Sequence, residues 1–361
     1  MPHALFGSPV IAAPMAGGTS TPAFVTAVHH AGGLGFLAAG YKSVEAMLAE
    51  IGAVRASGAR FGTNLFVPDP AQLPPSAAVQ ARLEEYRRRL APEAARYGVD
   101  VPALRLDDDD RWQGKIDALL ADPVELVSFT FGLPGPDVAR ALRRAGSAVL
   151  ATVTTVAEAL EAAEQGVDAL VVQHASAGGH SAAFPSLAPG PKVSPDAGLG
   201  STRGGRGGPG GQPGTTAELV ARVRSAVGLP LLGAGAVMDR QGLADVLDAG
   251  AQAAQLGTAF LRTDESGARQ LHKDALASPR FTETALTTAF TGRPARALVN
   301  EFVRDFPDAP DAYPAVHHLT APLRAAAAAA GDTERLNLWA GTGWQRARAG
   351  SVAEVMAELL G

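Results

Sequence analysis

Short continuous runs of apolar residues recur along the chain, and amphipathic or charged segments separate them. Eight of these runs have the length and the flanking turn residues of a β-strand. They cover residues 9–15, 34–39, 60–67, 124–131, 148–153, 168–173, 229–235 and 251–257. The pattern therefore predicts eight strands, each followed by a segment of different periodicity.

The segments between the runs have the apolar spacing of helices. Helices are predicted from Ser43, a typical N-cap residue, to Gly58, and over residues 22–31, 137–145, 156–165, 216–227 and 240–249. Eight alternations with mostly short links favour a (β/α)8 barrel of the TIM type. The alternative is an open doubly wound sheet. It ranks second because the first turn lacks the phosphate-binding fingerprint of that fold.

Two stretches interrupt the alternation. Residues 69–122 are predicted to be a helical insertion, with a charged helix over 78–90 and an acidic run over 107–110. We interpret the acidic run as a solvated helix start, because four adjacent aspartates cannot all face one metal ion. Residues 185–214 are rich in proline and glycine, which predicts a flexible loop over the active-site face.

The sequence after the eighth strand differs from the barrel pattern. Residues 266–361 are predicted to be mainly helical and to cover the barrel mouth, whereas residues 1–265 form the barrel. The run of alanines over 325–330 is a strong helix former.

Composition narrows the class of protein further. The chain has 361 residues, 47% of them hydrophobic, enough for one large domain or two of ordinary size. A net charge of −5 argues against nucleic acid or an anionic membrane as partner, despite an Arg-Gly-Gly segment at 203–208. The absence of cysteine excludes disulfides, thiolate metal sites and cysteine nucleophiles. No stretch approaches the length of a membrane span, so a cytoplasmic protein is expected.

A candidate catalytic group follows the sixth predicted strand. Gln173 ends that strand, and Gly178, Gly179 and His180 come shortly after it. Two glycines let the backbone approach a ligand closely, and the carboxyl end of a parallel sheet is where ligands bind. His180 is therefore a candidate acid or base. The alternative is an ordinary loop histidine on a glycine turn.

Small residues end the seventh and eighth predicted strands. They are Gly235 and Ala236 after the seventh, and Gln255, Leu256, Gly257 and Thr258 at the end of the eighth. In parallel barrels the loops at these places commonly bind a phosphate through main-chain N–H groups. The alternative is that the glycines only terminate strands.

Other strand ends suit an aromatic cofactor. Ala13, Pro14 and Met15 would leave a flat wall after the first strand. The amides of Asn64 and Gln173 can donate and accept at once, which suits the pyrimidine edge or ribityl chain of a flavin. With the phosphate segments, these residues predict a mononucleotide cofactor across the barrel mouth. No metal is expected.

Several motifs together resemble the nitronate monooxygenase family, once called 2-nitropropane dioxygenases. The family segment Gln-Gly-x-Glu-Ala-Gly-Gly-His corresponds to residues 173–180. The other similar segments are 13–18 (Ala-Pro-Met-Ala-Gly-Gly), 31–35 (Ala-Gly-Gly-Leu-Gly), 64–68 (Asn-Leu-Phe-Val-Pro), 255–260 (Gln-Leu-Gly-Thr-Ala-Phe), 291–296 (Thr-Gly-Arg-Pro-Ala-Arg), 313–324 and 338–341 (Leu-Trp-Ala-Gly). The resemblance covers nearly the whole chain outside the glycine-rich loop.

The resemblance implies a barrel that holds FMN without a covalent bond. It implies a catalytic His180 and the oxidation of alkyl nitronates, or also nitroalkanes, by O₂ to carbonyl compounds and nitrite. The residues it implies for FMN are Asn64, Gln173, Gly178, Ala236 and 255–258. Three positions depart from the family pattern: His174 and Ser176 stand for glycine and glutamate, and Ala236 stands for a glycine.

Two other functions stay open at this point. One is an FMN- and NAD(P)H-dependent enoyl-thioester reductase on the same barrel, and the other is a flavin-binding barrel without catalysis. His180 could act either as a base or as an anion-binding group. Four basic residues near the C-terminal motifs are interpreted by default as structural or rim residues, with the alternative that one of them faces the substrate: Arg293, Arg296, His317 and His318.

Overall fold

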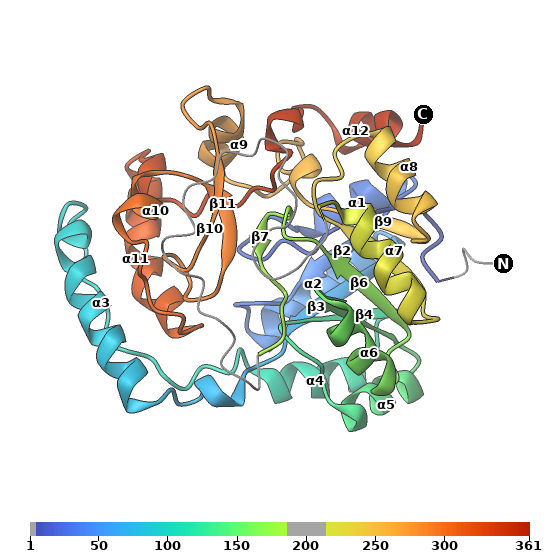
Figure 1. Ribbon diagram of the computed structural model, residues 1–361, viewed down its shortest axis with the longest axis horizontal. Helices are drawn as coiled ribbons and strands as arrows, with labels where there is room; N and C mark the ends of the chain where they lie inside the picture. The colour runs from blue at the N-terminus through green and yellow to red at the C-terminus, as the bar shows by residue number, and fades with distance from the viewer. Residues whose placement is uncertain (1–4, 186–213) are drawn as a thin grey trace.

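The computed structural model describes residues 5–185 and 214–361, and eight strands in it close into a parallel barrel (Figure 1). The strands follow one another around the barrel in chain order, as in a (β/α)8 fold. They are β1 (Val10–Ala12), β2 (Leu34–Ala38), β3 (Phe61–Phe66), β4 (Leu126–Thr130), β5 (Ala148–Val153), β6 (Ala169–Gln173), β8 (Leu231–Ala234) and β9 (Ala253–Leu256). Each lies within a predicted apolar run, so the predicted fold class is confirmed.

Helices cover the outside of the barrel. They are α1 (Pro22–His30), α2 (Val44–Ala56), α4 (Trp112–Ala121), α5 (Pro136–Ala145), α6 (Val156–Glu164), α7 (Thr216–Ala226) and α8 (Arg240–Asp248). The Ser43 side chain accepts the Ala46 N–H, which confirms the predicted N-cap of α2. The last helix, α12 (Val352–Leu360), packs against both α1 and α8 and completes the ring.

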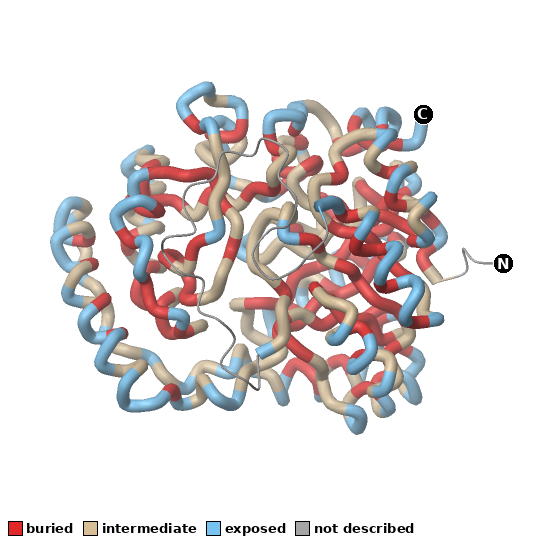
Figure 2. The backbone as a smooth tube through the Cα atoms, viewed as in Figure 1, coloured by how far each residue is buried: buried red, intermediate tan, exposed pale blue. Residues whose placement is uncertain are grey.

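The barrel interior is closed at one end and open at the other. Its amino end is filled by buried apolar side chains, among them Ile11, Phe36 and Leu232. Its carboxyl end carries polar side chains such as Asn64 and Gln173, which line a cavity. Figure 2 shows that buried residues concentrate in the barrel, while exposed residues lie mostly on the outer helices. Among the residues that the structure describes, the cavity therefore lies at the carboxyl end of the barrel.

The insertion between β3 and β4 is helical, as predicted. It holds η1 (Pro70–Gln72) and α3 (Ala77–Ala95), and it leads into α4. The long helix α3 packs against α11 (Ala315–Ala329), away from the barrel strands (Figure 1).

The interpretation of the acidic run as a solvated helix start is wrong for two of its four residues. Asp107 is exposed, but the side chains of Asp108 and Asp110 are only 15% and 18% accessible. Asp110 forms an ion pair with Lys115 at 2.8 Å and Asp108 forms one with Arg105 at 3.2 Å, and the other Asp108 oxygen lies 2.7 Å from the His318 Nε2. Arg105 and Lys115 are near in the sequence, whereas the contact between Asp108 and His318 depends on the tertiary fold.

The C-terminal part is mainly helical, as predicted, but it also contains a small sheet. Its further elements are α9 (Gln270–Ala277), α10 (Glu301–Asp305), η3 (Thr333–Arg335), η4 (Trp344–Arg346), β10 (Thr284–Thr287) and β11 (Ala295–Leu298), whereas η2 (Thr258–Phe260) directly follows β9. β11 pairs with β10 on one side and with β7 (Gly179–His180) on the other. The division of the chain at residue 265 stays a prediction.

Most of the predicted loop over residues 185–214 lies outside the described residues. Among the helices that the structure describes, none is long and apolar enough to cross a bilayer.

Candidate active site

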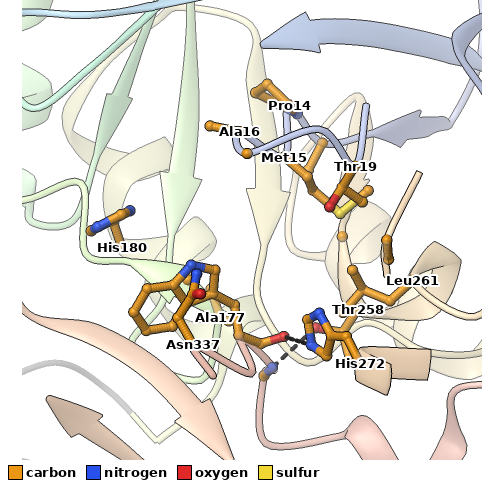
Figure 3. Close-up of a pocket in the computed structure, with 18 of the residues that line it drawn as sticks. Pro14, Met15, Ala16, Thr19, Ala177, His180, Thr258, Leu261, His272 and Asn337 are labelled. Carbon is orange, nitrogen blue, oxygen red and sulfur yellow. Dashed lines mark hydrogen bonds between the residues drawn. The ribbon is translucent and has the colours of Figure 1, made fainter. Parts of the chain in front are cut away.

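A cavity opens at the carboxyl ends of the barrel strands. It has a volume of about 390 Å³, and residues of the segment 267–341 form its far wall. Every residue that the sequence singled out for cofactor or catalysis lines it: Ala13, Pro14, Met15, Asn64, Gln173, Gly178, Gly179, His180, Gly235, Ala236, Gln255, Leu256, Gly257 and Thr258. Figure 3 shows His180 on one side of the cavity and Thr258 with Leu261 on the other.

The pairing of β7 with β11 places His180 at the cavity wall, opposite Ala295 in the register. The His180 Nε2 lies 2.9 Å from the Thr291 Oγ1. The Gln173 amide donates to the His180 carbonyl at 3.1 Å and accepts the Ala182 N–H at 2.8 Å. Gln173 therefore anchors the loop that carries His180, which the sequence did not suggest.

Aromatic rings surround His180. The nearest ring centroids lie 5.4 to 6.4 Å from its own and belong to Phe66, Phe131, Tyr313 and Trp339. Burial, together with the positive charges of Arg293 and Arg324, lowers the pKa of His180 to about 3. The imidazole is therefore neutral at pH 7. The neutral imidazole can accept a proton, but it carries no positive charge that would attract an anion.

Arg324 brings a buried positive charge to the same cavity. Its Nη1 donates to the Asn337 Oδ1 and its Nε to the Thr320 Oγ1, both at 3.1 Å. Burial lowers the pKa of Arg324 to about 10, so it remains charged at neutral pH. Among the described residues, no carboxylate pairs with it and no aspartate or glutamate lines the cavity. A buried cation without a counter-ion favours an anionic ligand.

The predicted phosphate segments form a concave stretch of backbone. Gly235 and Ala236 have φ values of +124° and +53°. The N–H groups of Gly235, Ala236 and Gly257 donate to no other described residue. Successive free N–H groups in such conformations form anion-binding nests. Alanine in the left-handed region is strained, and strain of this kind concentrates at functional sites.

Thr258 has a structural partner as well as a place in the cavity. Its Oγ1 accepts the Gly341 N–H at 3.0 Å (Figure 3). The hydroxyl therefore ties the end of β9 to the C-terminal segment. Its proton remains available for a ligand.

The Asn64 side chain is fixed at the cavity floor. Its Nδ2 donates to the Ser128 Oγ at 2.9 Å and to the Thr130 Oγ1 at 3.0 Å. The amide is 2% exposed, so these bonds hold it in one orientation. Its Oδ1 is left to accept a hydrogen bond.

Two of the departures from the family motif interact with each other. The His174 Nδ1 accepts the Ser176 N–H at 3.2 Å and lies 2.8 Å from the Ser176 Oγ. A Cβ on Gly235 would meet this Oγ at 2.8 Å, so Ser176 packs directly against the phosphate segment. The site therefore lacks a carboxylate here and has a local hydrogen-bonded turn in its place.

The four C-terminal basic residues differ in their relation to the cavity. His317 lines the cavity and stacks on Tyr41 with ring centroids 4.1 Å apart and an interplanar angle of 3°. The other three are structural. Arg293 donates to the Ser181 carbonyl at 3.3 Å, Arg296 donates to the Ala175 carbonyl at 2.8 Å, and His318 pairs with Asp108 at 2.7 Å.

Several lining residues received no role from the sequence. They are Tyr41, His272, Arg324, Asn337 and Trp339. One signal was present: His317, Ala321 and Arg324 are spaced four and three residues apart, as on one face of a helix. That spacing could not show that this face of α11 meets the barrel.

A parallel barrel with such a cavity at the carboxyl ends of its strands has the architecture of α/β-barrel enzymes. Comparison with known families identifies the branch. The family model for nitronate monooxygenase matches residues 3–193 and 197–361. The chain belongs to the nitronate monooxygenase family and is thus a flavin-dependent oxidoreductase.

Individual relatives agree with this assignment. A probable nitronate monooxygenase of Staphylococcus saprophyticus is 34% identical over 339 residues, covering 92% of this chain and 88% of the relative. The solved structure of a nitroalkane oxidase from Streptomyces ansochromogenes is similar with a TM-score of 0.88 and 45% identity, covering 99% of this chain and 96% of that one. FabK from Thermotoga maritima shares the fold, with a TM-score of 0.70 and 21% identity over 98% of this chain and 92% of its own.

Proposed function

We propose that the protein is an FMN-dependent nitronate monooxygenase that oxidises alkyl nitronates with O₂ to carbonyl compounds and nitrite. The observation that carries the proposal is one cavity in which a neutral His180 and a cationic Arg324 occur together without any acidic lining residue among those described. A nitronate is an anion, so such a cavity would attract it. Family membership supports the same reaction.

The residues at the barrel mouth fit FMN. The free N–H groups of Gly235, Ala236 and Gly257 suit its phosphate. Asn64, Gln173 and the wall of Ala13, Pro14 and Met15 would border the ring system and ribityl chain, with Gly178, Gly179, Gln255, Leu256 and Thr258 completing the site. A single phosphate site, formed by both segments together, and the lack of a dinucleotide fingerprint favour FMN over FAD.

When bound, FMN would supply the electron acceptor that links substrate oxidation to O₂. His180 would remove the α-proton of a neutral nitroalkane. The Thr291 Oγ1 lies 3.4 Å from the Arg293 carbonyl, so it can donate there and accept the His180 Nε2–H. This chain of hydrogen bonds would leave the Nδ1 as the proton acceptor.

Arg324 would hold the negative charge that this proton transfer creates. The guanidinium is fixed by Asn337 and Thr320, so it needs no rearrangement when the nitronate forms. With a preformed nitronate the proton transfer is unnecessary, and the cavity would only bind and orient the anion.

The test is an absorbance spectrum of the purified protein, followed by anaerobic titration with a nitronate. The protein should be yellow, release FMN rather than FAD on denaturation, and release nitrite from propionate 3-nitronate in air. A colourless protein that takes up no added FMN would refute the proposal. Bleaching of the flavin by NADH without nitrite release would favour the enoyl-thioester reductase. Bound FMN with neither activity would favour a barrel without catalysis.

A further inference from the structure

The acidic run 107–110 contacts the barrel rim through a buried ion pair. The Asp110 Oδ1 accepts the Tyr41 N–H at 2.9 Å, and its Oδ2 lies 2.8 Å from the Lys115 Nζ. That Nζ also donates to the Ala39 carbonyl at 2.9 Å, and the Lys115 side chain is 1% exposed. Asp110 and Lys115 thus hold the loop after β2 at two backbone groups, the Tyr41 N–H and the Ala39 carbonyl.

These two hydrogen bonds hold the backbone of Tyr41 in an unfavourable conformation. Tyr41 has a φ of +67°, in the left-handed region that a bulky residue rarely adopts. The strained backbone directs the ring into the cavity wall, where it lies flat on His317 and edge-on to Phe66. Strain of this kind persists only where surrounding contacts enforce it.

The same run also contacts α11. The Asp108 Oδ2 lies 2.7 Å from the Nε2 of His318, the neighbour of His317. The other oxygen of Asp108 accepts the Asp110 N–H at 3.0 Å. The two aspartates therefore join the barrel loop of Tyr41 to the helix of His317. These are the two elements whose rings stack on each other.

We propose that Asp108 and Asp110 are positioning residues that set the substrate-facing wall formed by Tyr41 and His317. The inference rests on the proposed function for its substrate. The pair acts mainly on binding rather than on proton transfer, because Thr291 and the pairing with β11 hold the His180 imidazole. Among the described residues, His180 and Tyr41 share only ring contacts, to Phe66 and Tyr313.

The kinetic test compares aspartates of one run. Asp110→Asn and Asp108→Asn should each raise KM for a nitronate about tenfold and leave kcat within about twofold. Asp107→Asn is the matched control, because the Asp107 side chain is 91% exposed, and its KM should not change. FMN content should stay the same in all three, since the phosphate segments follow other strands.

A double-mutant cycle tests whether Asp110 acts through Tyr41. Tyr41→Ala removes the ring and should itself raise KM. If Asp110 only positions that ring, adding Asp110→Asn to Tyr41→Ala should raise KM little further. A full additional increase would overturn the proposed route.

Hydrogen exchange of the cofactor-free protein gives a readout that needs no turnover. Exchange in residues 39–43 should rise about tenfold in Asp110→Asn relative to Asp107→Asn, because the Tyr41 N–H loses its acceptor. In Asp110→Asn the Lys115 charge turns the amide oxygen away from Tyr41. Adding Lys115→Met frees that oxygen to accept the Tyr41 N–H, so protection of this N–H should recover in part. The recovery is incomplete because the bond from Lys115 to the Ala39 carbonyl is lost as well.

The outcomes separate this proposal from the proposed function. Faster exchange with an unchanged KM in both Asp108→Asn and Asp110→Asn would reduce the aspartates to structural supports and overturn the proposal. Absence of nitronate turnover in the unmodified protein would refute the proposed function instead. In that case an unchanged exchange rate in Asp110→Asn would overturn the positioning role. A raised rate would support the positioning of Tyr41 by Asp110.

Discussion

His180 lies in a cavity with an anion-binding character, yet burial and two arginine charges keep its imidazole neutral. A base with a pKa of about 3 accepts a proton only if the imidazolium that forms is stabilised at once. A nitronate formed beside it supplies that negative charge. His180 would therefore work as a base only together with its substrate, and it should matter most where a proton must be removed.

Replacing His180 with asparagine tests this dependence. Activity on neutral nitroalkanes should fall by about two to four orders of magnitude, because the proton acceptor is lost. Activity on preformed nitronates should fall less, and FMN content should not change. His30→Asn, at an exposed position, serves as the control. Equal small losses on both substrates would remove His180 from the chemistry.

Three buried histidines, His180, His272 and His317, have a lowered pKa and should make the protein less stable in acid. Burial lowers the pKa of His272 to about 4 and that of His180 to about 3, both from an ordinary value of 6.5. The unfolded chain binds these protons below about pH 6.5, whereas the folded protein does not. Their contribution is thus complete above pH 6.5 and is lost as the pH falls toward 4 and then 3.

Urea unfolding at several pH values measures this contribution. Stability should fall by about 1.4 kcal/mol per pH unit for each proton that only the unfolded chain binds. His272→Gln cannot titrate there, so its stability should depend less steeply on pH between 6 and 4. A variant with the same slope as the unmodified protein would show that His272 is not held neutral.

At the scale of elements, the short contact between the β6–β7 loop and the C-terminal segment depends on Gly178. A Cβ there would lie 2.5 Å from the Gly341 nitrogen and 2.6 Å from the Ala340 carbonyl carbon. Both are backbone atoms, so one segment would have to move. The hydrogen bond from the Gly341 N–H to Thr258 would be strained with it.

Gly178→Ala should therefore lower the free energy of unfolding by about 1–3 kcal/mol, the usual cost of overpacking. Gly52→Ala is the opposite case, because that glycine lies in α2 with nothing within 4 Å of the new methyl group. It should be neutral or stabilising by about 0.5–1 kcal/mol. Chemical denaturation of both variants gives the comparison. Similar effects in the two would argue against the close approach.

The elements that the sequence predicted share a local cause. Each barrel strand contains a continuous apolar run, and a capping residue such as Ser43 or Thr155 marks the start of a helix. β7, β10 and β11 have two to four residues each and form only because their partners lie alongside. The burial of Asp110 likewise depends on Lys115 and Tyr41. Such partners are set by the tertiary fold, which the local pattern does not contain.

The candidate site divides in the same way. Residues at strand ends, such as Asn64, Gln173 and Ala236, meet because a parallel barrel brings all its carboxyl ends together. Fold class alone was enough to group them. Arg324 and His317 come from α11, and their place depends on how that helix packs over the mouth. The periodicity of apolar residues in the sequence does not predict how α11 packs over the barrel mouth.

At the scale of the whole molecule, the cavity belongs to two parts of the chain at once. Gln173 and Ala236 come from the barrel, whereas Arg324 and Trp339 come from the segment after it. The last helix, α12, returns to the barrel and packs between α1 and α8. Because each part buries cavity-lining residues of the other, we expect the two parts to unfold together in one transition.

The three tryptophans allow this to be measured, because Trp112 lies in α4 whereas Trp339 and Trp344 follow the barrel. In Trp112→Phe, tryptophan fluorescence reports only the C-terminal part, and far-ultraviolet circular dichroism reports the whole chain. Both transitions should coincide, and FMN at a hundred times its Kd should stabilise both by about 2.7 kcal/mol, because it would bind only the folded cavity. Separate transitions, with FMN shifting only one, would make residues 266–361 an independent domain and would place the cofactor on the barrel alone.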